Sequence, residues 1–465
     1  MHWRLVFWVV ATAGMTACQL IDESLCADES CEWTARQWQA LQGLTLQAAP
    51  APDPSNAYST NKAAAALGQR LFFDRNFSGT ARGKDAIERP ALSQITNVGQ
   101  PLLISCASCH SPWAAGTDIA SPLDTVSVGA GTTDVNALPT LNAAYHKIFF
   151  WNGRVDSLWG LSAVVLESKT TMNGTRLRLA HEVAERYAAE FSAIFEGLPP
   201  DWQARVSKMP RDGKPGDLDY EKMSPSDRDL ATALLVNWAK ATAAYEQQLV
   251  SKNSPFDRFM AEGPKSSWLS PQARAGARLF VGKAACIDCH NGPLFSDDDF
   301  HNIGVPQGGA GVPTLADCPP GGACDCSVGS NCLPWGAFDG LNKLKKNGFL
   351  RDSRWSDDVA DDSRASYRNR VLGNELKGAW RTPSLRDVAL TPPYMHNGVF
   401  ATLKDVLLHY NGASAATRAN SVGTTAVNLK PLHLTDTELD ELAAFLASLT
   451  GDPLPTSLIT PGSNP

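Results

Sequence analysis

The chain has 465 residues, of which 43% are hydrophobic and 19% charged, so it is long enough for two or three compact domains. This composition excludes a disordered or membrane-spanning protein. The 41 basic and 48 acidic side chains give a formal net charge of -7. Because no basic excess draws the chain onto a polyanion, we expect no nucleic-acid partner.

The N-terminus has the layout of an export signal. Arg4 precedes an apolar run over residues 5–14, which is too short to span a bilayer as a mature helix. Residues 15–18 then resemble a bacterial lipobox, whose cysteine is lipidated. Ordinary signal-peptide cleavage with an incidental Cys18 is the alternative. We predict a signal peptide with a lipobox over residues 1–18, and a periplasmic protein held to the outer membrane only by a lipid anchor.

Export would place the 11 cysteines in an oxidising compartment, where thiols pair unless other chemistry uses them. Cys26 and Cys31 are close enough in sequence for a local bridge. Four more fall within a predicted Cys-rich insertion over residues 306–345, namely Cys318, Cys324, Cys326 and Cys332. Four cysteines allow three pairings, and the sequence does not choose among them. A metal cluster in this loop is the alternative.

An internal repeat indicates two copies of one domain type. The pattern Gly-x-Arg-Leu-Phe occurs at residues 68–72 and again at residues 276–280, each time on an apolar helical pattern. We therefore predict an N-terminal segment and linker, two domains and a tail, over residues 19–57, 58–255, 256–455 and 456–465.

Helix signals dominate the chain. Residues 224–250 carry apolar side chains at helical spacing, which predicts a long amphipathic helix. Thr435 and Glu438 form a capping-box pattern before an apolar stripe, and Gly451 marks the expected end of that helix. Strand signals are few, so the predicted fold is mostly α.

Downstream of each repeat stands the five-residue motif C-x-x-C-H. In this motif two thiols form thioethers with the vinyl groups of a haem, and the histidine ligates the iron. A pair of redox or zinc sites would not explain a histidine directly after both motifs. The sequence therefore predicts two covalently bound c-type haems, held by Cys106, Cys109 and His110 and by Cys286, Cys289 and His290.

Three longer phrases, at residues 136–151, 282–306 and 380–403, closely resemble the bacterial diheme cytochrome c peroxidase and MauG family. The resemblance extends from about residue 61 to about residue 450. It implies two tandem class I cytochrome c-like domains with haem sites facing a shared interface. It also implies reduction of hydrogen peroxide with electrons from a small cytochrome c or cupredoxin, a MauG-like oxidation of a partner as a variant, and a possible homodimer.

The resemblance also assigns roles. It makes His110 the ligand of a peroxidatic haem and His290 the ligand of an electron-transfer haem, with Trp151 between the two. A calcium site between the domains would use Asn136, Thr391 and Pro393, which suits a hard cation that prefers oxygen ligands.

For the second haem the resemblance points to a tyrosine ligand. The sixth ligand of family members lies fourteen residues after the histidine that corresponds to His396, and is a methionine in peroxidases but a tyrosine in MauG-type enzymes. Here that position is Tyr410. Met395, a softer ligand that would give a higher reduction potential, is the alternative.

The first haem departs from the family. Leu161 and Thr171 stand where most members have a Gln and a proton-handling Glu, and Val126 stands where some keep a removable histidine. Since peroxide cleavage needs a nearby group that moves a proton, Glu167 is the candidate substitute. Met172 could instead bind the iron and close the site, which would make the protein a plain electron carrier.

Overall fold

The computed structural model describes residues 32–46, 49–82, 86–90, 93–121, 126–306, 335–412, 421–427 and 429–462. The predicted signal peptide with its lipobox, Cys26, Cys31 and the four insertion cysteines lie outside these ranges. Within them, no helix is both long and apolar enough to cross a membrane.

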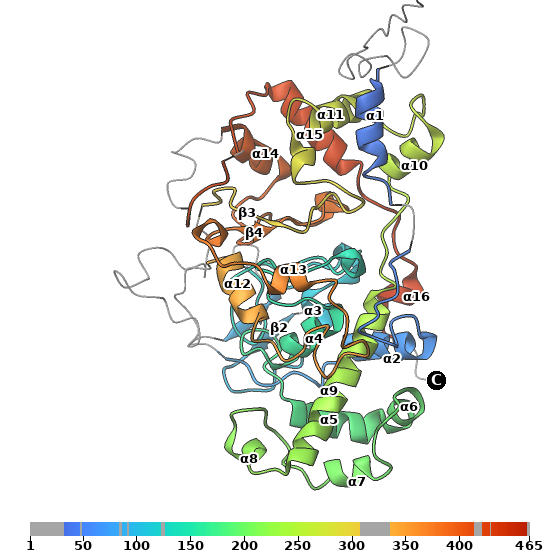
Figure 1. Ribbon diagram of the computed structural model, residues 1–465, viewed down its shortest axis with the longest axis vertical. Coiled ribbons are helices and arrows are strands. Elements are labelled where there is room, and N and C mark those ends of the chain that lie inside the picture. Colours follow the sequence, from blue (N-terminus) through green and yellow to red (C-terminus); the bar gives the residue numbers. More distant parts are fainter. Residues whose placement is uncertain are drawn as a thin grey trace, which may run out of the picture.

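The fold is mostly helical, as predicted (Figure 1). The α-helices are α1 Ala35–Gln42, α2 Lys62–Phe73, α3 Cys106–Cys109, α4 Leu158–Glu167, α5 Arg176–Arg186, α6 Ala188–Ile194, α7 Trp202–Val206, α8 Leu218–Glu221, α9 Pro225–Glu246, α10 Pro255–Glu262, α11 Pro271–Val281, α12 Ala337–Leu344, α13 Ala365–Arg368, α14 Leu403–Gly412, α15 Asp436–Ala447 and α16 Thr456–Ile459. Short 3-10 turns are η2 Pro112–Ala114, η3 Ala143–Tyr145, η4 Cys286–Asp288, η7 Asn374–Leu376 and η8 Val388–Leu390.

Strands are short and form two antiparallel pairs. In the first, β1 Ile87–Arg89 pairs with β2 Gln94–Thr96, with Glu88 opposite Ile95. In the second, β3 Phe300–His301 pairs with β4 Trp380–Arg381. The second pair joins two of the phrases that carry the family resemblance.

The repeated glycines explain why each half has the same helix pair. Gly68 of α2 faces α9 so closely that a Cβ atom would lie 1.9 Å from the carbonyl oxygen of Ala241. Gly276 of α11 meets α15 in the same way, with the carbonyl oxygen of Glu441 only 2.0 Å from the added atom. Both crossings therefore require a residue without a side chain. Each helix pair contributes buried residues to one of the two main hydrophobic cores.

The first and last described segments of the chain each pack on the opposite half (Figure 1). Near the N-terminus, Trp33 and Trp38 pack on Phe259 of α10, with ring centroids 5.7 and 5.6 Å apart. Near the C-terminus, the hydroxyl of Tyr245 on α9 donates to the carbonyl oxygen of Leu458, 2.5 Å away. The N-terminal segment is thus packed on the second core, and the C-terminal tail on the first.

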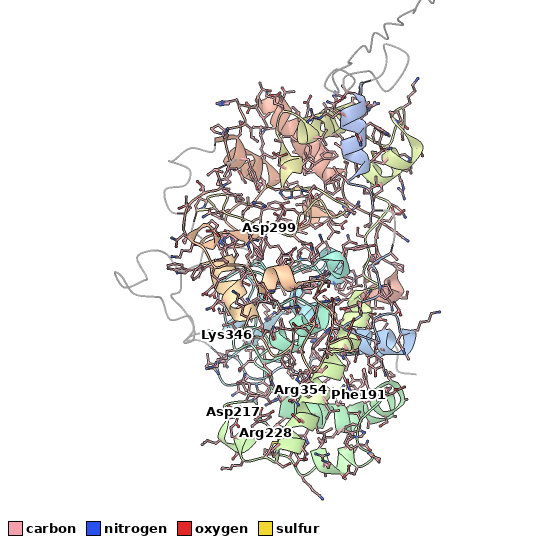
Figure 2. All side chains as sticks on the ribbon, in the orientation of Figure 1. Phe191, Asp217, Arg228, Asp299, Lys346 and Arg354 are labelled. Carbon is pink, nitrogen blue, oxygen red and sulfur yellow. The ribbon has the colours of Figure 1, made fainter. Side chains whose placement is uncertain are left out.

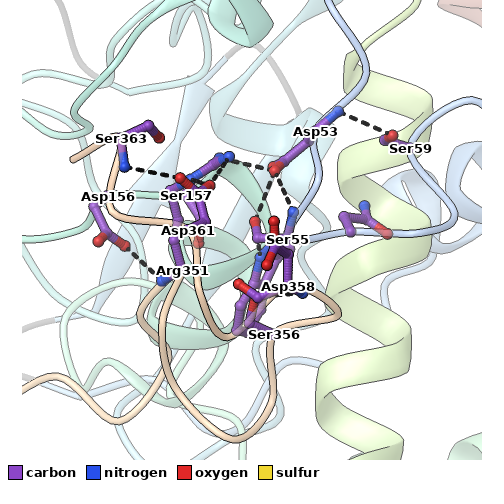
Figure 3. A network of polar contacts seen from close by, with 12 residues as sticks. Asp53, Ser55, Ser59, Asp156, Ser157, Arg351, Ser356, Asp358, Asp361 and Ser363 are labelled. Atoms are coloured by element: carbon purple, nitrogen blue, oxygen red, sulfur yellow. Dashed lines mark hydrogen bonds and ion pairs between the residues drawn. The ribbon is translucent and has the colours of Figure 1, made fainter.

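A loop of the second half also packs on the first half. Figure 3 shows its anchor, Arg351, whose guanidinium pairs with Asp361 of the same loop and with Asp53, 2.7 Å away. Nearby, Arg354, labelled in Figure 2, pairs with Asp229 of α9. These contacts hold residues 349–361 against the first core.

Candidate haem sites

The first motif forms a single helical turn. Ser105 precedes α3, and the backbone N–H of His110 closes the turn on the carbonyl of Cys106, 2.9 Å away. Both thiols are free of disulfides. The Nδ1 atom of His110 lies 3.0 Å from the carbonyl oxygen of Gly116, which orients the ring and leaves Nε2 for iron.

A cavity of about 240 Å³ lies beside this motif. Its lining includes Cys106, Cys109 and His110 from the motif, together with residues of both halves of the chain. Four buried polar atoms on its wall have no protein partner within the described residues: Thr140 Oγ1, Asn152 Oδ1, Trp238 Nε1 and Glu246 Oε2. Such orphaned atoms are rare in proteins. A haem, with its propionates and associated water, would supply their missing partners, so the residues fit this cofactor.

Only some of the residues predicted for the distal face of the first haem line this cavity. Leu161, Thr171 and Met172 line the cavity, and Met172 is only 4% exposed. The hydroxyl of Thr171 donates to the carbonyl of Val165, 2.7 Å away, so it serves the backbone.

Glu167 is not among the residues that line this cavity. Its two carboxylate oxygens accept hydrogen bonds from Arg176 Nε and Nη2 at 2.9 and 2.8 Å. The carboxylate is therefore held in a separate ion pair. Val126 is buried.

The second motif has a similar local structure. Cys286 begins η4, Cys289 follows its last residue, and both are free thiols. Nδ1 of His290 lies 2.9 Å from the carbonyl oxygen of Phe295. Burial, together with the cysteine groups of the motif, raises the pKa of Tyr410 on α14. The phenol of Tyr410 therefore lies near the second motif, where an iron could displace its proton.

Met395, the alternative ligand, belongs to a strained turn. Its backbone has a φ of 72°, and its carbonyl oxygen lies 3.3 Å from Nδ2 of Asn136. Nδ2 of Asn136 also lies 3.2 Å from the carbonyl oxygen of Pro393. In this orientation the amide donates to both carbonyls, and only the reversed amide would offer Oδ1 beside them to a cation. The hydroxyl of Thr391 donates to Val388.

Three rings lie in contact where the two halves of the chain meet. The Nε1 atom of Trp151 donates to the carbonyl of Asn136 at 3.0 Å, and its indole meets His396 edge-on, with centroids 6.5 Å apart. His396 stacks in turn on Trp380. Because Trp151 and Trp380 both line the first cavity, the rings extend from its wall into the second half.

A buried ion network ties the halves together beside these rings. Asp298 Oδ1 lies 2.6 Å from Nδ1 of His146 and 3.0 Å from Nη1 of Arg381. Burial favours the protonated form of Asp298, but His146 and Arg381 outweigh it and hold the pKa of this carboxyl below its ordinary value. Burial and Arg381 lower the pKa of His146, and Asp298 opposes this effect.

Asp297, His301 and Cys289 could together hold a metal ion, because their ligand atoms lie within 4.8 Å of one another. Because Cys289 is also the predicted attachment point of a haem, we assign no separate metal site to this trio.

Sequence reasoning missed four residues that shape the sites: Arg89, Glu246, Trp380 and Arg381. Trp380 and Arg381 stand within a phrase that carries the family resemblance, which was the available signal. No pattern in the sequence indicated a role for Arg89 or Glu246.

The chain is similar to known proteins over most of its length. A family model described as di-haem cytochrome c peroxidase matches residues 62–265. The cytochrome-c peroxidase IdrP1 of Denitromonas iodatirespirans is 30% identical over 86% of this chain and 85% of its own length. The methylamine utilization protein MauG of Methylorubrum extorquens is 25% identical over 98% of this chain and 96% of its own.

Solved structures show the same fold. The diheme peroxidase BthA of Burkholderia thailandensis matches with a TM-score of 0.55 and 23% identity, over 90% of this chain and 95% of that one. A MauG-like protein associated with microbial copper homeostasis matches with a TM-score of 0.54 and 22% identity, over 90% and 98% of the two chains.

Proposed function

Because the chain belongs to the di-haem cytochrome c peroxidase and MauG family, we propose that it is an exported oxidoreductase that reduces hydrogen peroxide. Electrons would come from a small periplasmic redox protein, a cytochrome c or a cupredoxin. Two covalently bound c-type haems would supply the redox chemistry, one at His110 for peroxide and one at His290 for electrons. The cavity beside His110 supports this proposal most directly, since a haem bound there would supply partners for polar atoms that have none within the described residues.

The chain's own residues would divide the work. His110 and His290, oriented by the carbonyls of Gly116 and Phe295, would hold the irons. Trp151 lies on the wall of the first cavity and contacts His396 of the second half, which suits a residue that passes electrons between the two haems. Tyr410 would ligate the second iron as in MauG-type enzymes, and this favours oxidation of a partner protein as a variant of the activity. Asn136 with the carbonyl of Pro393 would bind calcium.

A second candidate function is electron transfer without catalysis. The observation that favours it is Met172, a buried thioether on the wall of the cavity that holds His110. Leu161 and Thr171 offer no side chain that moves a proton well, and Glu167 is bound to Arg176. If Met172 ligated the first iron, peroxide could not reach it.

Optical and EPR spectra of the ferric holoprotein, before and after one equivalent of hydrogen peroxide, separate the two functions. The peroxidase proposal predicts a high-spin signal from the first haem that peroxide removes. Two low-spin haems that do not respond would support the electron carrier. In that case Met172→Leu should open the first site, and Thr171→Glu should speed the reaction if only the proton-handling group is missing.

A further inference from the structure

Arg89 is a buried cation in an unexpected place. On β1 the side chains alternate, so Ile87 and Arg89 point inward and Glu88 points to solvent. Ile87 belongs to an apolar cluster with Leu102 and Ile104. Arg89, on the same inward face, is only 1% exposed. A buried guanidinium strongly destabilises a fold unless hydrogen bonds and a negative charge compensate it.

Hydrogen bonds to neutral groups account for part of this compensation. Nη2 of Arg89 donates to the carbonyl of Val128 and, at 3.2 Å, to the carbonyl of Gly129. Nη1 lies 3.7 Å from the Sγ atom of Cys109, the second cysteine of the first haem motif. The remaining Nε–H is buried and has no partner within the described residues.

No carboxylate pairs with Arg89 anywhere in the described ranges. Asp118 is the acid whose charge acts on Cys109. Its carboxylate already accepts hydrogen bonds from Ala120 N at 2.8 Å, and from the backbone N–H and hydroxyl of Ser121. Among the described residues, therefore, no carboxylate neutralises this guanidinium, which lies beside the sulfur through which a haem would be attached.

We propose that Arg89 is a fixed positive charge that raises the reduction potential of the haem attached through Cys109. Reduction adds one electron to the haem and makes it more negative. A cation at its thioether edge therefore stabilises the reduced form, and burial strengthens the effect because little water screens the charge. The inference rests on the proposed function only in requiring haem at this motif.

Arg89 also has a positioning role. The carbonyls that it binds belong to residues 128–129, and Gly129 is wedged against residues 170–171, where a Cβ atom would lie 2.4 Å from the carbonyl oxygen of Thr170. The backbone N–H of Ala130 donates to the carbonyl of Thr171. The guanidinium thus supports the loop that brings Thr171 and Met172 to the cavity.

Spectroelectrochemical titration of both haems in the purified holoprotein tests the proposal. Arg89→Met removes the charge but keeps side-chain length, and should lower the equilibrium constant for reducing the first haem by at least about tenfold, or 59 mV for one electron. Arg89→Lys keeps the charge and should stay within that limit. Arg178→Met, which removes a half-buried cation of the same half paired with Asp212, should shift neither haem.

An Arg89→Met protein that binds both haems at wild-type potentials overturns the proposal. So does an Arg89→Lys protein shifted as far as Arg89→Met, because shape rather than charge would then matter. If Arg89→Met does not assemble, Arg89→Gln carries the same test, since its amide can still donate to Val128. Peroxide turnover is not the readout, so loss of the proposed activity alone leaves this result interpretable.

Discussion

The indole of Trp380 lies face to face on the imidazole of His396, with ring centroids 3.9 Å apart and 17° between the ring planes. His396 is 2% exposed, and burial lowers its pKa to about 3, so the imidazole in this stack is neutral. Its Nε2 has no partner within the described residues. Together with Trp151, these rings join the wall of the first cavity to the second half, and we expect them to form a path for electrons between the haems.

We expect Trp380→Leu to slow electron exchange between the haems. The substitution removes the ring that stacks on His396, which is also one of the indoles on the cavity wall. The loss of aromatic packing should also lower the free energy of unfolding by about 1 kcal/mol or more. Flash reduction of one haem, followed optically, would measure the exchange rate. The control is Trp202→Leu, because Trp202 is also buried but donates a hydrogen bond to Ser192 and does not line the cavity. An unchanged rate in Trp380→Leu excludes this ring from the path.

Tyr410→Phe should change the ferric spectrum of the second haem. Removing the phenol oxygen leaves the iron five-coordinate or exchanges the ligand for Met395. Optical and EPR spectra of the ferric holoprotein would detect either change. Tyr394→Phe, which alters a half-buried tyrosine on another segment of the same half, should leave the spectrum intact. If Tyr410→Phe also leaves it intact, Tyr410 is not the ligand.

Much of the fold followed from local sequence patterns. The helix after Thr435 begins where its capping box predicts, and the long helix begins directly after Ser224, within the predicted range of residues 224–250. The second helix ends at Ala447, before Gly451, because Ser448 already closes its last turn. The repeated glycines marked two equivalent helix pairs, and each lies at the close crossing of its pair.

The parts of the sites that sequence could not predict depend on contacts between distant segments. Asn136 reaches Pro393 across 257 residues of chain. Glu167 ends α4 and pairs with Arg176, the first residue of α5, through a turn that helical spacing does not describe. Alternation along β1 places Ile87 and Arg89 on one face, but nothing in those three residues indicates that this face is the buried one.

Arg351→Met should destabilise the contact between the halves. The guanidinium is 8% exposed and pairs with Asp53 and Asp361, whose side chains are 16% and 8% exposed. Its loss leaves two largely buried carboxylates without their cation, which costs about 3–5 kcal/mol. Denaturant unfolding of the holoprotein would measure this change.

The neighbouring Arg354→Met is the matched control for Arg351. Arg354 pairs with Asp229, but the two side chains are 65% and 53% exposed, so the loss should be below about 1 kcal/mol. Equal losses in the two variants would contradict the role given to Arg351.

Glu246→Gln should change how stability depends on pH. The carboxyl is 5% exposed, and burial raises its pKa from an ordinary value of 4.5 to about 8. Between these values the folded state keeps a proton that the unfolded chain has released. Stability therefore falls as pH rises through this window, by at most about 1.4 kcal/mol per pH unit. A glutamine cannot ionise, so the variant should lose this slope and gain stability over the native protein at pH 8.

Unfolding of both holoproteins between pH 5 and pH 9 would measure the slopes, with Glu88→Gln, on the solvent face of β1, as the control. Parallel profiles for the native protein and Glu246→Gln would mean that Glu246 stays ionised, with a cation or the haem environment compensating its charge.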